Sequence, residues 1–122
     1  MIKKTTFIFS ILLLLISCSS TLNFSGESRN WKGNYTTTID TQTNSEQGTY
    51  EFRFKGKSTN NNTLDEILIE NNGKSTRLTE ISLQKGGIKV PVSCSGCTLS
   101  SKNKPIKITI KWDNTEESFN LN

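Results

Sequence analysis

Residues 106–112 read Ile-Lys-Ile-Thr-Ile-Lys-Trp, and this stretch decides the fold class. Its apolar side chains alternate with polar ones at every step. Because successive side chains of a β-strand point to opposite faces of the sheet, the alternation predicts a strand with one buried face and one solvated face. Burial on one face only is typical of antiparallel sheets, in which the other face meets water.

The same alternation recurs in other parts of the chain. It runs through residues 31–40, 50–55 and 88–94, and each of these is predicted to be a half-buried strand. Residues 64–70 are apolar on both faces at Ile67-Leu68-Ile69, which indicates a more central strand.

Turn residues and two less regular segments complete the pattern. Asn72-Gly73 is the preferred pair for a type I′ hairpin turn. Residues 77–83 are compatible with either a strand or a short helix. Residues 113–116 turn the chain into a last strand, which carries Phe119 and Leu121.

Length and composition support one small β domain. The chain has 122 residues, which is room for a single domain. It contains no Ala, the best helix former, while Thr, Ser and Asn together supply 44 residues. Those residues suit strand faces and turns. About seven strands in about 90 residues therefore predict an all-β, antiparallel, immunoglobulin-like sandwich over residues 31–122.

Residues 1–17 are predicted to be a cleaved signal peptide. Lys3 and Lys4 form a short basic start, and residues 7–16 form an apolar run that only Ser10 interrupts. This run is too short to span a hydrocarbon core, which takes about 20 residues in a helix. A basic start and a short apolar run are typical of a secretory leader rather than of a membrane anchor.

The leader ends in Leu15-Ile16-Ser17-Cys18, which resembles a bacterial lipobox. In lipoproteins with this pattern, the cysteine sulfur is joined to a diacylglycerol and the leader is removed just before it. The resemblance implies that Cys18 becomes the lipidated N-terminus; the alternative is an ordinary secretory leader with an incidental cysteine. Residues 18–30 show no clear apolar period after the cysteine, which predicts that this lipidated segment is a flexible tether.

Three cysteines in an exported chain leave one odd thiol. If Cys18 is acylated, Cys94 and Cys97 remain as an even pair in an oxidising compartment. The sequence Cys94-Ser95-Gly96-Cys97 has three interpretations: a disulfide around a tight turn, a redox-active pair, or free or metal-binding thiols. Thioredoxin-like chemistry needs a helix N-terminus and zinc needs about four ligands, and neither pattern is present, so the disulfide is favoured.

Catalytic and cofactor chemistry have little support in the sequence. The chain has no His, which excludes His-ligated metal sites and His-based catalytic dyads or triads. The pairs Asp65-Glu66 and Glu116-Glu117 are adjacent carboxylates, but neighbours on a strand point to opposite faces and cannot act together. A carboxylate pair assembled from distant strands stays open. We therefore expect no enzyme, no catalytic residue, no metal and no cofactor.

Positive charge is concentrated in the C-terminal part. Residues 84–113 carry six Lys and one Asp, whereas residues 18–122 have 13 basic and 11 acidic side chains, a net charge of only +2. Four of the lysines, Lys102, Lys104, Lys107 and Lys111, predict a surface that contacts anionic envelope polymer or lipid headgroups. The alternative is solvation and protection of a sheet edge. So small a net charge does not indicate nucleic acid as a partner.

Several short motifs occur together in this chain. Besides the lipobox, they are Asn30-Trp31-Lys32-Gly33-Asn34-Tyr35, Gly48-Thr49-Tyr50-Glu51-Phe52, Cys94-Ser95-Gly96-Cys97 and Ile108-Thr109-Ile110-Lys111-Trp112. Taken together they resemble small uncharacterised lipoproteins of Bacillus-like Firmicutes. The resemblance implies a lipid-anchored protein on the extracytoplasmic face of the cell membrane, and it implies no activity.

Two classes of function follow from the sequence. The first is a non-catalytic binding or accessory module of the cell envelope, held at the membrane by covalent lipid, with an anionic polymer or an envelope protein as partner. The second is an envelope enzyme or a thiol-disulfide redox protein that uses Cys94 and Cys97. A smooth sandwich favours binding, and a deep pocket with convergent polar groups favours an enzyme.

Overall fold

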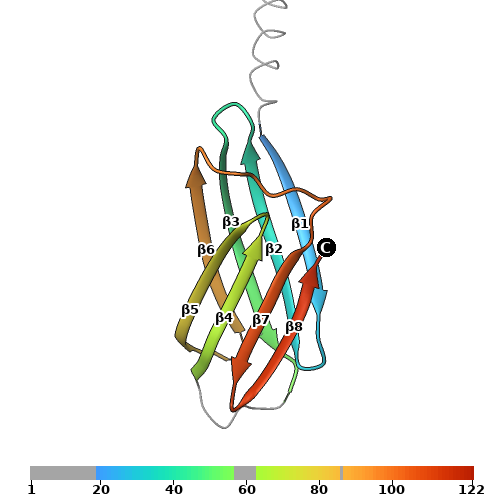
Figure 1. Cartoon of the computed structure of the whole chain (residues 1–122), viewed down its shortest axis with the longest axis vertical. Helices are drawn as coiled ribbons and strands as arrows, with labels where there is room; N and C mark the ends of the chain where they lie inside the picture. The colour runs from blue at the N-terminus through green and yellow to red at the C-terminus, as the bar shows by residue number, and fades with distance from the viewer. Residues whose placement is uncertain (1–18, 57–62, 86) are drawn as a thin grey trace, which may run out of the picture.

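The computed structural model describes residues 19–56, 63–85 and 87–122, and these residues form two antiparallel sheets packed face to face (Figure 1). The strands are β1 (Ser19–Glu27), β2 (Trp31–Asp40), β3 (Ser45–Phe54), β4 (Thr63–Asn71), β5 (Lys74–Ser82), β6 (Gly87–Ser95), β7 (Ile106–Trp112) and β8 (Thr115–Leu121). The prediction of an all-β, antiparallel sandwich is confirmed, with eight strands in place of about seven.

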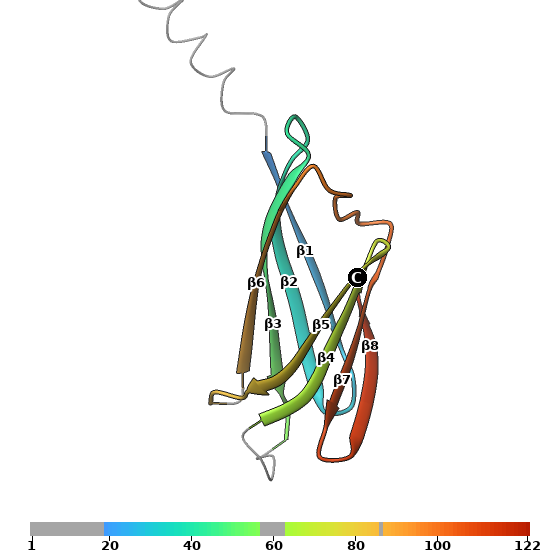
Figure 2. The ribbon, with the colours of Figure 1, turned by 60° about the vertical axis from the view of Figure 1, so that its left-hand side comes forward.

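One sheet has the strand order β1-β2-β3-β6, and the other has the order β5-β4-β7-β8. The chain crosses between the sheets after β3, after β5 and after β6, and Figure 2 shows the two layers from the side. With β1 set aside, β2 to β8 follow the strand order of a constant-type immunoglobulin domain except at β5. That strand, the fourth of the seven, lies beside β4 instead of β6.

The flexible tether predicted for residues 18–30 is wrong for most of its length. Residues 19–27 form β1, which pairs with β2 over its whole length, from Ser19 opposite Asp40 to Glu27 opposite Lys32. Phe24 is only 1% exposed and anchors the strand in the core. Residues 19–27 therefore belong to the folded domain, which does not begin at residue 31.

The core is formed by the alternating side chains of both sheets. Trp31, which starts β2, is completely buried, and its ring meets Trp112 of β7 edge to face at 5.7 Å. Tyr35 and Tyr50 stack across β2 and β3 with ring centroids 3.9 Å apart. The alternations predicted from the sequence are confirmed, because the apolar residues of β2 and β7 face inward and their polar neighbours face outward.

Turn chemistry agrees with the sequence. Asn72 and Gly73 both have positive φ values, 48° and 83°, as a type I′ turn requires. The ambiguous residues 77–83 are mostly strand, because β5 extends to Ser82. Glu80 has a φ of 51°, and the buried side of β5 changes at this position.

The two long sides of the sandwich differ. On one side, Ser25 of β1 and Asn122 exchange backbone hydrogen bonds of 3.0 and 2.9 Å, which join the two sheets. On the other side, β5 and β6 are the outer strands of their sheets. The half-buried side chains Leu78, Ile81, Val90 and Val92 pack against the core from these two strands.

Candidate functional site

The predicted lipidation site and leader, Cys18 and residues 1–17, lie outside the described residues. The first described residue, Ser19, is also the first residue of β1. It pairs with Asp40, so this end of the domain also carries the turn between β2 and β3 (Figure 1). The chain that follows Cys18 is therefore a strand of the folded domain from Ser19 onward.

Cys94 and Cys97 form a disulfide at the same end, with a Cα–Cα distance of 6.0 Å. Cys94 lies near the C-terminal end of β6. Gly96, in the turn that follows, has a φ of 65°, a conformation that favours glycine. The carbonyl oxygen of Asn44 accepts hydrogen bonds from the backbone N–H groups of Gly96 and Cys97, at 2.8 and 3.3 Å. Among the described residues no helix begins here, so the pair lacks the helix N-terminus that acidifies a thioredoxin-type thiol.

We expect a Cys94→Ala/Cys97→Ala variant to keep the fold and to lose about 2 kcal/mol of unfolding free energy. The loss is modest because so short a loop restricts the unfolded chain only slightly. Urea unfolding checks the magnitude, and thiol counting on unreduced protein checks the bond. Two free thiols in oxygen-exposed protein would contradict the disulfide, and an unusually acidic thiol in the reduced protein would favour the redox interpretation.

A buried carboxylate, Glu46 of β3, lies between the sheets near the disulfide and is 6% exposed. It accepts hydrogen bonds from the Tyr35 hydroxyl at 2.5 Å and from Thr37 Oγ1 at 2.9 Å. It also accepts two from Ser100, through the backbone N–H at 2.8 Å and the hydroxyl at 2.6 Å. Burial acts to raise the pKa of Glu46, but these hydrogen bonds outweigh it and hold the pKa below its ordinary value of 4.5.

The tyrosines around Glu46 are held in the neutral form. Burial raises the pKa of Tyr35 above its ordinary value of 10.0, and the hydrogen bond to Glu46 adds to the effect. Burial raises the pKa of Tyr50 to about 12. Asn71 Nδ2 donates to Tyr50 Oη at 3.2 Å and to Ser100 Oγ at 2.8 Å, which links the cluster to β4.

This polar cluster fastens the connection between β6 and β7 to both sheets. A cavity of about 50 Å³ beside it has room for only one or a few water molecules. The cluster therefore positions a loop. Glu46 also lines a wide, open hollow of about 640 Å³, together with Asp40 and Cys94. Sequence reasoning missed Glu46, although it lies on the same face of the strand as Tyr50 and Phe52.

The four lysines predicted to form one basic surface do not share one environment. Lys111 of β7 lies 3.3 Å from Glu66 and 3.8 Å from Glu116, so its charge is paired on the sheet surface. Lys102 donates a hydrogen bond to a backbone carbonyl of β1, and its ammonium lies 4.8 Å from the centroid of the Phe24 ring. These two lysines serve local contacts between elements.

Lys104 and Lys107 do lie together. With Lys74 they line one shallow, open hollow beside the hairpin between β4 and β5. Glu70 lines the same hollow, and Lys104 donates to Asn72 Oδ1 at 3.0 Å. The structure therefore brings together two of the four predicted lysines and adds Lys74, which sequence reasoning had not grouped with them.

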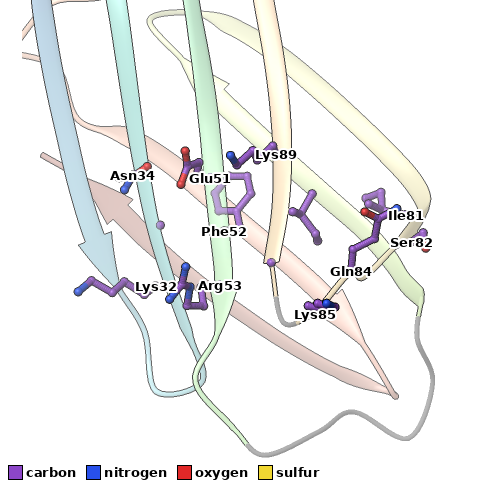
Figure 3. Close-up of a pocket in the computed structure, with 13 residues that line it drawn as sticks. Lys32, Asn34, Glu51, Phe52, Arg53, Ile81, Ser82, Gln84, Lys85 and Lys89 are labelled. Atoms are coloured by element: carbon purple, nitrogen blue, oxygen red, sulfur yellow. The ribbon is translucent and has the colours of Figure 1, made fainter.

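A second basic hollow, of about 680 Å³, opens at the end of the first sheet that is far from Ser19 (Figure 3). Its lining includes four cations and one carboxylate, Glu51. The cations are Lys32 of β2, Arg53 of β3, Lys89 of β6, and Lys85 in the segment before β6. Lys32, the pair Glu51 and Arg53, and the pair Lys85 and Lys89 come from three separate parts of the sequence, which the pairing of β2, β3 and β6 brings together. The alternation predicts that Lys32, Arg53 and Lys89 point outward from their strands, but it gives no signal for their grouping, and Lys85 lies outside the predicted strands.

Neither the described residues nor the comparisons with known proteins assign an activity. In residues 19–56, 63–85 and 87–122, no group of three His, Cys, Asp or Glu residues could hold a metal ion. No helix in the same part of the chain is long and apolar enough to cross a membrane. No protein-family model matches the chain, and no curated protein and no solved structure matches it significantly. The resemblance to small lipoproteins therefore stays a prediction.

Proposed function

We propose that this protein is a non-catalytic binding or accessory module of the bacterial cell envelope, held on the extracytoplasmic face of the cell membrane by a diacylglycerol on Cys18. Its partner is an anionic polymer or a protein of the envelope. The leader and the Leu-Ile-Ser-Cys sequence support the anchor. The sandwich and the disulfide between Cys94 and Cys97 support an exported domain.

One observation carries the proposal: β1 begins at Ser19, immediately after the cysteine of the lipobox. A lipid on Cys18 would hold the domain at the membrane surface by the end that bears the turn between β2 and β3 and the disulfide. The opposite end, where Glu27 pairs with Lys32, lies eight strand residues away, which is about 26 Å. That end would face away from the membrane and be available to a partner.

We expect Cys18→Ala to abolish lipid attachment and cleavage before residue 18. Mass spectrometry of protein extracted from membranes should find the unaltered chain starting at Cys18 with a diacylglycerol, whose two acyl chains make the attachment stable. The Cys94→Ala/Cys97→Ala variant is the matched control and should remain lipidated. A mature N-terminus elsewhere, without acyl chains, would contradict the proposal.

A further inference from the structure

We propose that the hollow lined by Lys32, Arg53, Lys85 and Lys89 binds a linear polyanion with phosphodiester groups, such as a polymer of glycerol phosphate (Figure 3). This inference deepens the proposed function, because it gives the binding module a site and a ligand chemistry. It differs from the lysine surface predicted from the sequence, since none of these four cations belongs to that surface.

The grouping follows from the register of three neighbouring strands. Lys32 pairs with Arg53, and Arg53 pairs with Gly87, so these three positions form one row across the outer face of the sheet. The third position has no side chain. A Cβ atom at Gly87 would meet only the Phe52 carbonyl oxygen, at 3.7 Å, so the glycine leaves open space at the end of the row. Lys89 borders this space from the next outward position of β6.

The electrostatics of the hollow favour an anion. Four cations and the carboxylate of Glu51, which lies opposite Lys89 in the register of β3 and β6, give the lining a net charge of +3, from 4 − 1. Glu27 lies opposite Lys32 on β1, outside the lining, and is paired with Lys55 at 3.4 Å. Arg53 offers a planar guanidinium that matches phosphate oxygens in pairs, and the lysines act as flexible point charges. The outward side chains of Lys32, Arg53 and Lys89 are exposed, so they can reach a ligand without a change in the fold.

The spread of the cations favours a chain over a single anion. β2, β3 and β6 are neighbours, so Lys32 and Lys89 stand on strands about 10 Å apart. One phosphate group can engage Arg53 and a neighbouring lysine, but it leaves the rest of the four cations without an anion. A polymer with an anion in every repeat places several charges along the row, and the open hollow lets the chain enter and leave.

The lining also discriminates between kinds of polyanion. Nucleic acid single strands bind through aromatic side chains on which the bases stack. The only aromatic residue of the hollow, Phe52, is 1% exposed and belongs to the core. A polymer without bases therefore fits the site better. Lipid headgroups of the anchoring membrane fit poorly, because the hollow lies at the far end of the domain from Ser19.

The test measures binding of a synthetic glycerol-phosphate oligomer to the full chain in neutral detergent micelles, by titration calorimetry. The logarithm of the binding constant should fall with the logarithm of the salt concentration with a slope of roughly −2 to −3 if three or four phosphates are neutralised. Lys32→Gln/Lys89→Gln should weaken binding and make the slope shallower by roughly 0.7 for each cation removed. Gly87→Glu should abolish binding, because its carboxylate would occupy the hollow.

The matched control is Lys104→Gln/Lys107→Gln, which removes the same charge from the other basic hollow and should leave binding nearly unchanged. The proposal is overturned if this control weakens binding as much as Lys32→Gln/Lys89→Gln does. It is also overturned if inorganic phosphate competes as well as the oligomer per phosphate, or if oligothymidylate of equal charge binds clearly tighter.

Two further measurements distinguish polymer binding from binding of lipid headgroups and from the effect of the lipid anchor. Adding anionic phosphatidylglycerol to the micelles should not displace the oligomer; displacement would make the headgroup the ligand and would overturn the polymer. Cys18→Ala protein should bind the oligomer as well as the unaltered chain does. Failure of lipid attachment and failure of polymer binding are therefore distinguished by independent measurements.

Discussion

Replacing Glu46 by Ala is expected to lower the free energy of unfolding by roughly 3–5 kcal/mol, because three buried donors lose their acceptor together. These donors are the hydroxyl of Tyr35 and the N–H and hydroxyl of Ser100. The Thr37 hydroxyl also loses Glu46 but keeps the Gln47 carbonyl oxygen as an acceptor, at 3.2 Å. Each unsatisfied polar group keeps its desolvation cost when its partner is removed. Urea unfolding followed by tryptophan fluorescence measures the change, since Trp31 and Trp112 lie in the core.

Glu51→Ala is the matched control, because Glu51 is an exposed carboxylate on the same strand. Its removal should change the unfolding free energy by no more than about 0.5 kcal/mol. Glu46→Gln should lie between the two alanine variants, since the amide keeps the shape but offers one acceptor oxygen in place of two. Equal stability of Glu46→Ala and Glu51→Ala would show that the buried cluster does not hold the sheets and the loop together.

The same carboxylate gives the stability a dependence on acid. The folded-state pKa of Glu46 lies below its ordinary value of 4.5. Its stabilising contribution is therefore complete above the unfolded pKa and is lost as the pH falls through the folded pKa. Glu46→Gln should remove this part of the acid destabilisation. A part should remain, because hydrogen bonds from Ser28 and Asn30 outweigh desolvation and also lower the pKa of Glu117.

The hydrogen-bond partners of Glu46 show which parts of the buried cluster can be predicted from the sequence. Alternation placed Tyr35 and Thr37 on one inward face, and the same parity extended back from Tyr50 puts Glu46 inward as well. Ser100 is different, because it lies in the connection between β6 and β7 and reaches Glu46 only through the packing of the two sheets. A polar contact between a strand and a distant loop has no periodic signal.

The predictions that rested on local geometry were the successful ones. The disulfide depends on four consecutive residues, and the hairpin at Asn72 depends on two. The two basic hollows depend on which strands become neighbours and in which register. Lys107 and Lys111 share an outward face, as the alternation predicts. Of these two lysines, only Lys111 makes an ion pair with Glu66 of the adjacent β4, which also pairs with Arg77 of β5 at 3.0 Å. The distribution of charge along the sequence therefore identifies a lysine-rich segment, but it does not predict which of these lysines share one surface of the folded domain.

The prediction of a tether failed for a physical reason that can be tested at Gly26. Residues 19–27 carry few apolar side chains, and besides the buried Phe24 it is backbone contacts with β2 and with the end of the chain after β8 that hold β1. At Gly26 the backbone of β1 approaches β8 so closely that a Cβ atom would lie 1.9 Å from the carbonyl oxygen of Asn120. Only glycine permits this approach, because the opposing atom is backbone and cannot move aside alone.

Gly26→Ala is therefore expected to separate β1 from β8 and to lower the free energy of unfolding by about 3 kcal/mol, the upper end of the usual cost of overpacking. The mutual hydrogen bonds of Ser25 and Asn122 should open, which accelerated hydrogen exchange at these two amides would report. Gly87→Ala is the matched control, since its Cβ would meet only one atom at an ordinary distance of 3.7 Å. If Gly26→Ala leaves both stability and exchange unchanged, β1 is not locked against the second sheet. If exchange rises as expected, the close backbone approach at Gly26 is what keeps residues 19–27 in the folded sandwich, a contact that the apolar pattern of the sequence does not reveal.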